Sequence, residues 1–286
     1  MILCVNGRLV PASKATVSAL DNGFLYGDGF YDTMRTYGGV LLELEEHLTR
    51  VERSAKRMKI DMPWSRERLR EWTLRVIARN KLKDARVRIT VTRGQHGFDF
   101  SSSKRPTLVI SAEHLKIPPR IYTSGVSAAT MRMERLMPAI KTIGLTNMIE
   151  AYQTAADLGV YEMICHDADR HVLEGASTNV FIVSRGTLLT PKRGMLPGIT
   201  RKRVLALAKK LKLRVRTAHV GVATLRGARE VFLTNRPREI IPVVKVDGRQ
   251  IGSGKPGPVT CRLMAAYDDY IEGYIAKNRK NQLLKS

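Results

Sequence analysis

Residues 171–201 read HVLEGASTNVFIVSRGTLLTPKRGMLPGITR, and this stretch decides which kind of fold the chain builds. Two apolar, strand-like runs enclose a segment of small residues from Gly175 to Asn179. Downstream, Pro197 and Gly198 favour a turn, and the residues after them predict a helix through Lys210. A strand pair that leads into a helix indicates a mixed fold of helices and strands.

The start of that helix is also a candidate anion site. The first N–H groups of a helix have no acceptor within it, so the amides of Ile199 and Thr200 point towards a potential anion. The Thr200 side chain would equally serve as a helix cap. Both interpretations stay open at this point.

The first half of the chain is expected to combine short strands with two helices. The turn Val5-Asn6-Gly7-Arg8 joins two strands, because Asn-Gly adopts the positive φ angles of a tight hairpin. Three glycines at 23–29 predict a loop. Apolar residues recur every three or four positions from 44 to 58, which predicts an amphipathic helix. The other expected elements of this half are a helix from about Ser65 and strands at 85–94 and 106–112.

The second half is expected to be rich in strands. A helical stripe ending at Gly159 consists of Leu145, Met148, Ile149, Tyr152 and Ala155. Residues 161–190 predict strands with turns at 167–169 and 185–186. Two further strands, at 231–233 and 240–246, and a final helix at about 259–276 complete the expected elements.

Pro118-Pro119 marks the expected domain boundary, because proline fits neither a helix interior nor a central strand. We expect a small N-terminal α/β domain at 1–116, an interdomain linker at 117–121 and a larger, strand-rich domain at 122–286. The predicted fold class is α+β with two domains.

The charge balance is unusual. The 286 residues contain 49 lysines and arginines against 26 aspartates and glutamates, which gives a net charge of +23. Proteins that bind nucleic acid concentrate such charge and add aromatic residues for stacking. Here only 6% of residues are aromatic and the basic residues recur along the whole chain, so we expect no specific nucleic acid partner.

Neither a membrane nor a metal is expected as a partner. The apolar runs extend over only a few residues, too short to span a bilayer. Cys4, Cys165 and Cys261 are too scattered for a disulfide framework or a C-x-x-C metal site. The amino terminus lacks the basic-then-apolar order of a secretory signal. We therefore expect a cytoplasmic protein with reduced thiols.

Three charged residues are candidates for chemistry. Lys141 ends an apolar stretch that the pattern places at a strand end before a helix, and a desolvated lysine can form a Schiff base with a carbonyl. Most such lysines instead extend to water. Glu174 closes a strand, where it is a turn carboxylate or the partner of a buried cationic ring nitrogen. Arg50 lies on the 44–58 helix away from the apolar stripe, either solvated or as a phosphate ligand.

The chain resembles the fold-type IV pyridoxal-phosphate enzymes in the order and spacing of these candidate residues, which are Arg50, Lys141, Glu174 and Gly198-Ile199-Thr200. That family includes branched-chain aminotransferases, D-amino-acid aminotransferases, (R)-amine transaminases and aminodeoxychorismate lyases. The resemblance covers nearly the whole chain. Its further motifs are VNG at 5–7, DNGFLYGDG at 21–29, EVFLTN at 230–235 and GKPGPVT at 254–260.

The resemblance implies pyridoxal 5'-phosphate as cofactor and a role for each motif residue. Lys141 would hold the cofactor as a Schiff base and move the substrate α-proton. Glu174 would keep the pyridine nitrogen protonated. The phosphate would be bound by Arg50 and by the turn at Gly198, Ile199 and Thr200, with a further cofactor contact from Thr234 or Asn235.

Two positions depart from the family pattern. Arg236 directly follows Asn235, at a position where the family commonly has a small hydroxyl residue. Gly144 stands where most members carry Asn.

The resemblance favours an apolar amino acid as substrate. Phe24, Tyr26, Phe30 and Tyr31 would line an apolar pocket. Arg88 matches the strand arginine near the substrate carboxylate of branched-chain enzymes, although a surface salt bridge explains it equally well. D-amino-acid enzymes carry an Arg and a His where this chain has Phe98 and Phe100, so D-alanine is disfavoured.

The expected function is therefore a class IV aminotransferase that moves an amino group between an apolar L-amino acid, such as a branched-chain one, and a 2-oxo acid. Aminodeoxychorismate lyase, which eliminates pyruvate, is the alternative, because DNGFLYGDGFYDTMRTY at 21–37 resembles it as well. A non-catalytic basic scaffold or RNA-binding protein is the distant alternative. Family members share their active sites across a homodimer, and we expect the same here.

Overall fold

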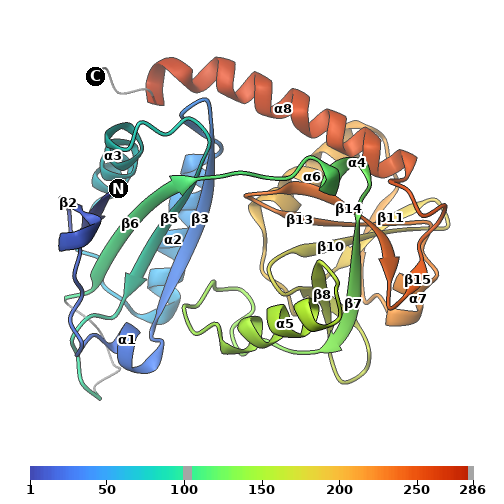
Figure 1. The fold of residues 1–286 in the computed structure, drawn as a ribbon, viewed down its shortest axis with the longest axis horizontal. Helices are drawn as coiled ribbons and strands as arrows, with labels where there is room; N and C mark the ends of the chain where they lie inside the picture. Colours follow the sequence, from blue (N-terminus) through green and yellow to red (C-terminus); the bar gives the residue numbers. More distant parts are fainter. Residues whose placement is uncertain (99–104, 283–286) are drawn as a thin grey trace. The chain divides into compact units, whose positions relative to one another are not determined.

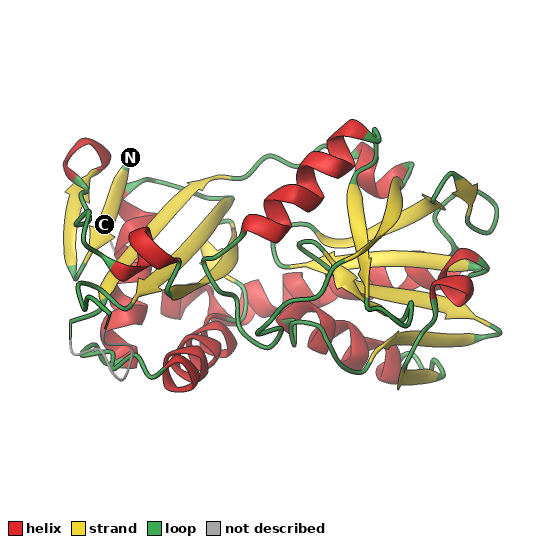
Figure 2. Ribbon diagram, turned by 90° about the horizontal axis from the view of Figure 1, so that it is seen from below, coloured by secondary structure: helices red, strands yellow, loops and turns green. Residues whose placement is uncertain are grey.

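The computed structural model describes residues 1–98 and 105–282, which form two compact units. The first unit contains the described residues of Met1–Lys116, together with Ile140–Gly144 and the last helix from Ile271. The second contains Ile117–Ala139 and Leu145–Tyr270. Both units combine strands with helices (Figure 2), which confirms the predicted α+β class.

A six-stranded antiparallel sheet forms the first unit, in the order β2-β1-β6-β5-β3-β4. On β5, Val87, Ile89 and Val91 are buried, as the alternating pattern predicts. Asn6 and Gly7 adopt φ angles of 47° and 85° in the predicted hairpin turn. The strands are β1 (Ile2–Val5), β2 (Arg8–Pro11), β3 (Gly29–Tyr37), β4 (Val40–Leu41), β5 (Ala85–Thr92) and β6 (Thr107–His114).

Helices α2 (Leu44–Met58) and α3 (Arg66–Arg79) pack against this sheet (Figure 1). The predicted stripe of α2 is buried at Leu44, Leu48, Val51 and Ala55. Ser65 caps α3, since its side chain accepts the N–H of Arg68. Both helix predictions are confirmed.

The predicted loop at 23–29 is wrong over its first half, where α1 (Asn22–Tyr26) forms one helical turn. The Asp21 carboxylate caps it by accepting the N–H of Gly23 at 2.7 Å. Gly27 ends it with a φ of 67°, which favours glycine. A helix this short has no apolar period, so the pattern could not indicate it. A single 3₁₀ turn, η1 (Ala12–Lys14), follows β2.

The second unit is built on a nine-stranded mixed sheet in the order β12-β11-β10-β13-β14-β7-β8-β9, with β15 beside β14. Strand β7 runs parallel to both of its neighbours, β14 and β8. The strands are β7 (Val126–Arg132), β8 (Glu162–His166), β9 (Val172–Gly175), β10 (Asn179–Ser184), β11 (Thr187–Pro191), β12 (Val215–Ala218), β13 (Glu230–Asn235), β14 (Glu239–Val246) and β15 (Arg249–Gln250).

Helix α5 (Thr146–Asp157) is confirmed, but of its predicted stripe only Ala155 is buried. The residues that face β7 and β8 are the small ones, with Ala151 and Ala155 buried. Ile149 and Tyr152 are 53% and 40% exposed. Alanines allow the helix to approach the strands closely, a preference that a search for large apolar residues misses.

Helix α8 (Pro258–Gln282) extends beyond the predicted end at 276. The Gln282 amide explains this, because it donates to the Leu41 carbonyl at 3.0 Å and accepts the Leu41 N–H at 2.8 Å. None of the described helices is long and apolar enough to cross a bilayer. The remaining helices are α4 (Arg120–Thr123), α6 (Ile199–Lys210) and α7 (Val222–Arg226).

Candidate active site

The sequence pattern predicted Lys141 at a strand end, and this prediction is wrong. Lys141 lies in the loop between β7 and α5. Strand β7 stops at Arg132, and the residues around Lys141 pair instead with the start of β3. The Tyr31 N–H donates to the Lys141 carbonyl at 2.8 Å, and the Ile143 N–H donates to the Gly29 carbonyl at 3.0 Å. The backbone of the lysine is therefore fixed within the first unit.

The Lys141 amine lies at the Tyr31 side chain. Its Nζ donates to the Tyr31 hydroxyl at 3.2 Å and lies 4.7 Å from the ring centroid. The Arg88 guanidinium lies 3.7 Å from the centroid of the same ring, and its Nε donates to the Thr90 hydroxyl at 3.0 Å. Burial lowers the pKa of Arg88 from its ordinary value. Two cationic side chains thus meet at one buried tyrosine.

Arg50 is buried, although the pattern placed it away from the apolar stripe. Its Nε and Nη2 donate to the two Asp32 carboxylate oxygens at 2.7 and 2.8 Å, and His47 Nδ1 lies 2.7 Å from Asp32 Oδ1. Burial disfavours the Asp32 charge, but the charges and hydrogen bonds of Arg50 and His47 outweigh it and hold the Asp32 pKa well below its usual range. Sequence reasoning missed Asp32 and His47. An acid within the apolar strand GFYDTM was the available signal.

The start of α6 presents unpaired polar groups. Its first i to i−4 bond joins the Lys202 N–H to the Gly198 carbonyl, so the amides of Ile199 and Thr200 precede all intrahelical acceptors. The buried hydroxyls of Thr200 and Thr234 make no hydrogen bond within the described chain. Buried hydroxyls without a partner are costly. Together these groups fit a bound anion such as a phosphate.

Asn179 holds this cradle in place. Its Nδ2 donates to the Leu196 carbonyl at 2.8 Å, and its backbone lies opposite Thr234 in the β10–β13 pair. A Cβ on Gly198 would lie 2.1 Å from Asn179 Oδ1. The φ of Gly198 is −65°, so glycine is required here by space and not by backbone angle.

Glu174 belongs to the same cluster in the second unit. Its Oε2 accepts the Leu196 N–H at 2.8 Å, and its Oε1 lies 3.2 Å from Arg135 Nη1. Leu196 therefore binds Glu174 through its N–H and Asn179 through its carbonyl. The sequence-predicted residues that the structure brings together here are Glu174, Gly198, Ile199, Thr200 and Thr234. Arg135 was missed, because no local pattern links it to Glu174.

A second buried carboxyl lies behind the loop that follows Glu174. Glu162 Oε2 accepts the Ser177 hydroxyl at 3.0 Å. Burial raises the Glu162 pKa to about 7, against the opposing hydrogen bond of Ser177 and the charge of Arg238. This group exchanges a proton near neutral pH without belonging to the anion cradle.

The remaining motif residues have other contacts. Asn235 Oδ1 accepts the Arg238 N–H at 2.9 Å, which closes the turn after β13. Arg236 is buried and donates to the Tyr267 hydroxyl on α8 at 3.0 Å. Gly144 leaves room for a side chain, since a Cβ there would lie 3.9 Å from the nearest contact, the Gly27 carbonyl.

The four aromatic residues predicted for the pocket fall into two groups. Phe24 and Tyr26 on α1 are 73% and 45% exposed, and the Tyr26 ring lies 5.5 Å from that of Phe98. Phe30 and Tyr31 on β3 are buried. Phe100, one of the two positions compared with the D-amino-acid clamp, lies outside the described residues.

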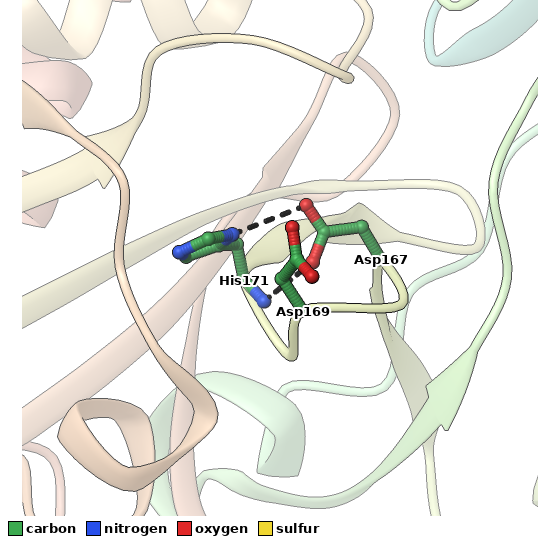
Figure 3. A group of neighbouring side chains, drawn as sticks. All are labelled: Asp167, Asp169 and His171. Atoms are coloured by element: carbon green, nitrogen blue, oxygen red, sulfur yellow. Dashed lines mark hydrogen bonds and ion pairs between the residues drawn. The ribbon is translucent and has the colours of Figure 1, made fainter.

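The turn between β8 and β9 gathers Asp167, Asp169 and His171, whose ligand atoms lie within 4.8 Å of one another (Figure 3). Asp167 Oδ1 accepts the His171 N–H at 2.7 Å, and its Oδ2 lies 3.2 Å from His171 Nδ1. These bonds close the predicted turn, so we assign the cluster a structural role.

Comparison with known proteins agrees with this geometry. The family model for class IV aminotransferases matches residues 29–246. A putative branched-chain-amino-acid aminotransferase of Methanocaldococcus jannaschii is 36% identical over 94% of this chain and 96% of its own, and a D-alanine aminotransferase of Bacillus licheniformis is 33% identical over 97% and 99%. The branched-chain aminotransferase of the thermophilic archaeon Thermoproteus uzoniensis, solved with norvaline, superposes with a TM-score of 0.89 at 28% identity, over 97% of this chain and 96% of that one. The chain belongs to the class IV aminotransferases.

Proposed function

We propose that this class IV aminotransferase takes its amino group from an apolar L-amino acid, with the branched-chain ones preferred, and passes it to a 2-oxo acid. The family uses pyridoxal 5'-phosphate. The names of the relatives leave both branched-chain and D-amino acids as donors. The choice between them rests on the group that binds the substrate carboxylate.

Arg88 carries the proposal. Its two terminal nitrogens make no hydrogen bond to any described residue, and its guanidinium lies at Tyr31, whose hydroxyl contacts Lys141. A guanidinium binds a carboxylate through two parallel hydrogen bonds. Arg88 therefore supplies an α-carboxylate anchor next to the reactive amine, whereas Phe98 offers no charge for the carboxylate of a D-amino acid.

The polar groups of the second unit fit the cofactor. The Ile199 and Thr200 amides and the Thr200 and Thr234 hydroxyls would bind its phosphate, and Glu174 would hold a proton on its ring nitrogen. When bound, pyridoxal phosphate supplies an electron-withdrawing ring that stabilises the charge left after a proton leaves the substrate α-carbon. The Lys141 amine would move that proton.

Arg50 is the proposed charged phosphate ligand. Asp32 occupies its Nε and Nη2, and its Nη1 makes no hydrogen bond within the described chain. The bidentate pair orients the guanidinium, so that Nη1 remains for a phosphate oxygen.

We propose a homodimer with shared active sites. Helix α1 carries three exposed apolar side chains, Phe24, Leu25 and Tyr26, which are between 45% and 73% exposed. Burying this patch against a second subunit would remove apolar surface from water. Light scattering should give twice the chain mass, and Phe24→Glu should shift the protein towards monomer. We further propose the cytoplasm as its location, because Cys4, Cys165 and Cys261 are free thiols.

A panel of amino donors tests the substrate. We expect kcat/KM for L-leucine to exceed that for D-alanine by about a hundredfold, in line with the loss of a charged, bidentate contact worth roughly 3 kcal/mol. Arg88→Met should raise KM for L-leucine. Arg86→Met on the same strand should not, because Arg86 is exposed and paired with Glu113. A preference for D-alanine, or pyruvate release from aminodeoxychorismate, would overturn the proposal.

A further inference from the structure

Within the described residues, the Tyr31 hydroxyl is the side-chain group that hydrogen-bonds to the Lys141 amine, and a second, backbone hydrogen bond joins the same two residues. The side-chain contact is the 3.2 Å bond from Nζ to the hydroxyl. The backbone contact is the 2.8 Å bond from the Tyr31 N–H to the Lys141 carbonyl. Because both ends of the lysine meet the same tyrosine, the path of its flexible four-carbon side chain is restricted.

The Tyr31 ring is itself held. It is buried within β3, and the Arg88 guanidinium lies 3.7 Å from its centroid. Arg88 is fixed in turn by its Nε bond to Thr90 on the same strand, β5. A cation against an aromatic face is attractive, and more so where water is excluded. The order of support is therefore Thr90, Arg88, Tyr31 and then Lys141.

We propose that Tyr31 is the positioning residue of Lys141, with Arg88 as the clamp on its ring. This inference rests on the proposed role of Lys141 as the lysine that captures the cofactor aldehyde. In that step the neutral amine attacks the carbonyl carbon, one carbon–nitrogen double bond forms and one water leaves. The Tyr31 hydroxyl accepts a hydrogen bond from the Lys141 amine and holds Nζ in one position. The lysine side chain therefore loses less conformational entropy when the amine attacks.

The arrangement also gives Arg88 two separate tasks. Its Cζ lies over the Tyr31 ring, and its terminal nitrogens, which make no hydrogen bond to any described residue, stay available for a carboxylate. Cofactor capture involves no substrate carboxylate, so it reports on the clamp alone.

Capture of pyridoxal phosphate by cofactor-free protein tests the inference. The absorbance change is followed by stopped flow across pH, and borohydride reduction with peptide mass spectrometry locates the modified lysine. Tyr31→Phe keeps the ring and removes only the hydroxyl. We expect its plateau rate at high pH to fall about tenfold, the equivalent of one hydrogen bond.

Tyr37→Phe is the matched control. Tyr37 lies on the same strand and carries a similar stacked cation, since Arg35 lies 4.3 Å from its ring centroid. Its capture rate should equal that of the wild type. Arg88→Met should slow capture in the same direction as Tyr31→Phe and provides a second arm.

The outcomes separate this inference from the proposed function. Modification of a lysine other than Lys141 in the wild type would overturn the role of Lys141 and with it both proposals. Modification of Lys141 at equal rates in wild type and Tyr31→Phe would overturn the positioning role alone. If Tyr37→Phe slowed cofactor capture as much as Tyr31→Phe does, the effect would belong to strand β3 in general, and the positioning role of Tyr31 would again be overturned.

Discussion

Replacing Asp32 by Asn should destabilise the first unit strongly while leaving its shape unchanged. Asn has the size of Asp but no charge, so Arg50 would remain buried without a counter-charge. The two side chains are only 2% and 7% exposed. Water therefore cannot replace the lost carboxylate.

The expected loss is roughly 3 to 5 kcal/mol in the free energy of unfolding, the cost of removing one partner from a buried ion pair. The His47 bond to Asp32 would be weakened as well. The folded pKa of Asp32 lies below its ordinary value, so the stabilisation is present above that ordinary value and is lost as pH falls towards the folded pKa. The contribution of the Asp32 charge itself to the difference between wild type and Asp32→Asn should thus be constant from pH 6 to 8.

Urea denaturation followed by tryptophan fluorescence measures this loss. Trp64 and Trp72 are the two tryptophans of the chain and both belong to the first unit, as does Asp32. Glu71→Gln is the control, because it makes the same change in exposed pairs with Arg68 and Arg75 and should cost less than about 1 kcal/mol. An Asp32→Asn protein within about 1 kcal/mol of the wild type would refute the reasoning.

Three further substitutions test the second unit. Glu174→Gln should lower kcat by on the order of a hundredfold, as for other well-placed electrostatic groups, and a change of about twofold would place Glu174 outside the site. Gly198→Ala should weaken pyridoxal phosphate binding at least about tenfold in an equilibrium titration, because the new Cβ would clash with the Asn179 side chain. Gly221→Ala at the start of α7 is the control, because a Cβ there meets no atom within 4 Å, and it should bind the cofactor normally. The raised pKa of Glu162 makes the folded state keep its proton to higher pH than the unfolded state does, so the wild type should lose on the order of 3 kcal/mol of stability between about pH 4.5 and 7. Glu162→Gln should not show this loss. Calorimetry that gives the same pH dependence for both proteins would contradict the prediction.

Local patterns predicted those elements whose burial is periodic. The stripe of α2 and the alternation of β5 follow from repeated apolar residues, and Pro197-Gly198 marks the start of α6. The family resemblance, carried by Lys141 and Glu174 with their neighbouring motifs, predicted the class of enzyme. These signals lie within short windows of sequence, which is why they could be interpreted without coordinates.

The partners of the site residues could not be predicted, because they come from distant parts of the chain. Asp32 meets Arg50 across a strand and a helix, and Arg135 meets Glu174 from a loop. The requirement for glycine at position 198 depends on the Asn179 side chain. Tertiary packing decides these contacts, and a single sequence contains no periodic trace of them.

Transfer of nitrogen from ¹⁵N-labelled L-leucine to a 2-oxo acid tests the central claim most directly. With pyridoxal phosphate present, the wild type should place ¹⁵N in the product amino acid at every turnover, as measured by mass spectrometry. Lys141→Ala should fold normally and transfer none, because the amine that moves the α-proton is gone. Release of ¹⁵N-ammonia without a labelled product, or normal transfer by Lys141→Ala, would contradict the account.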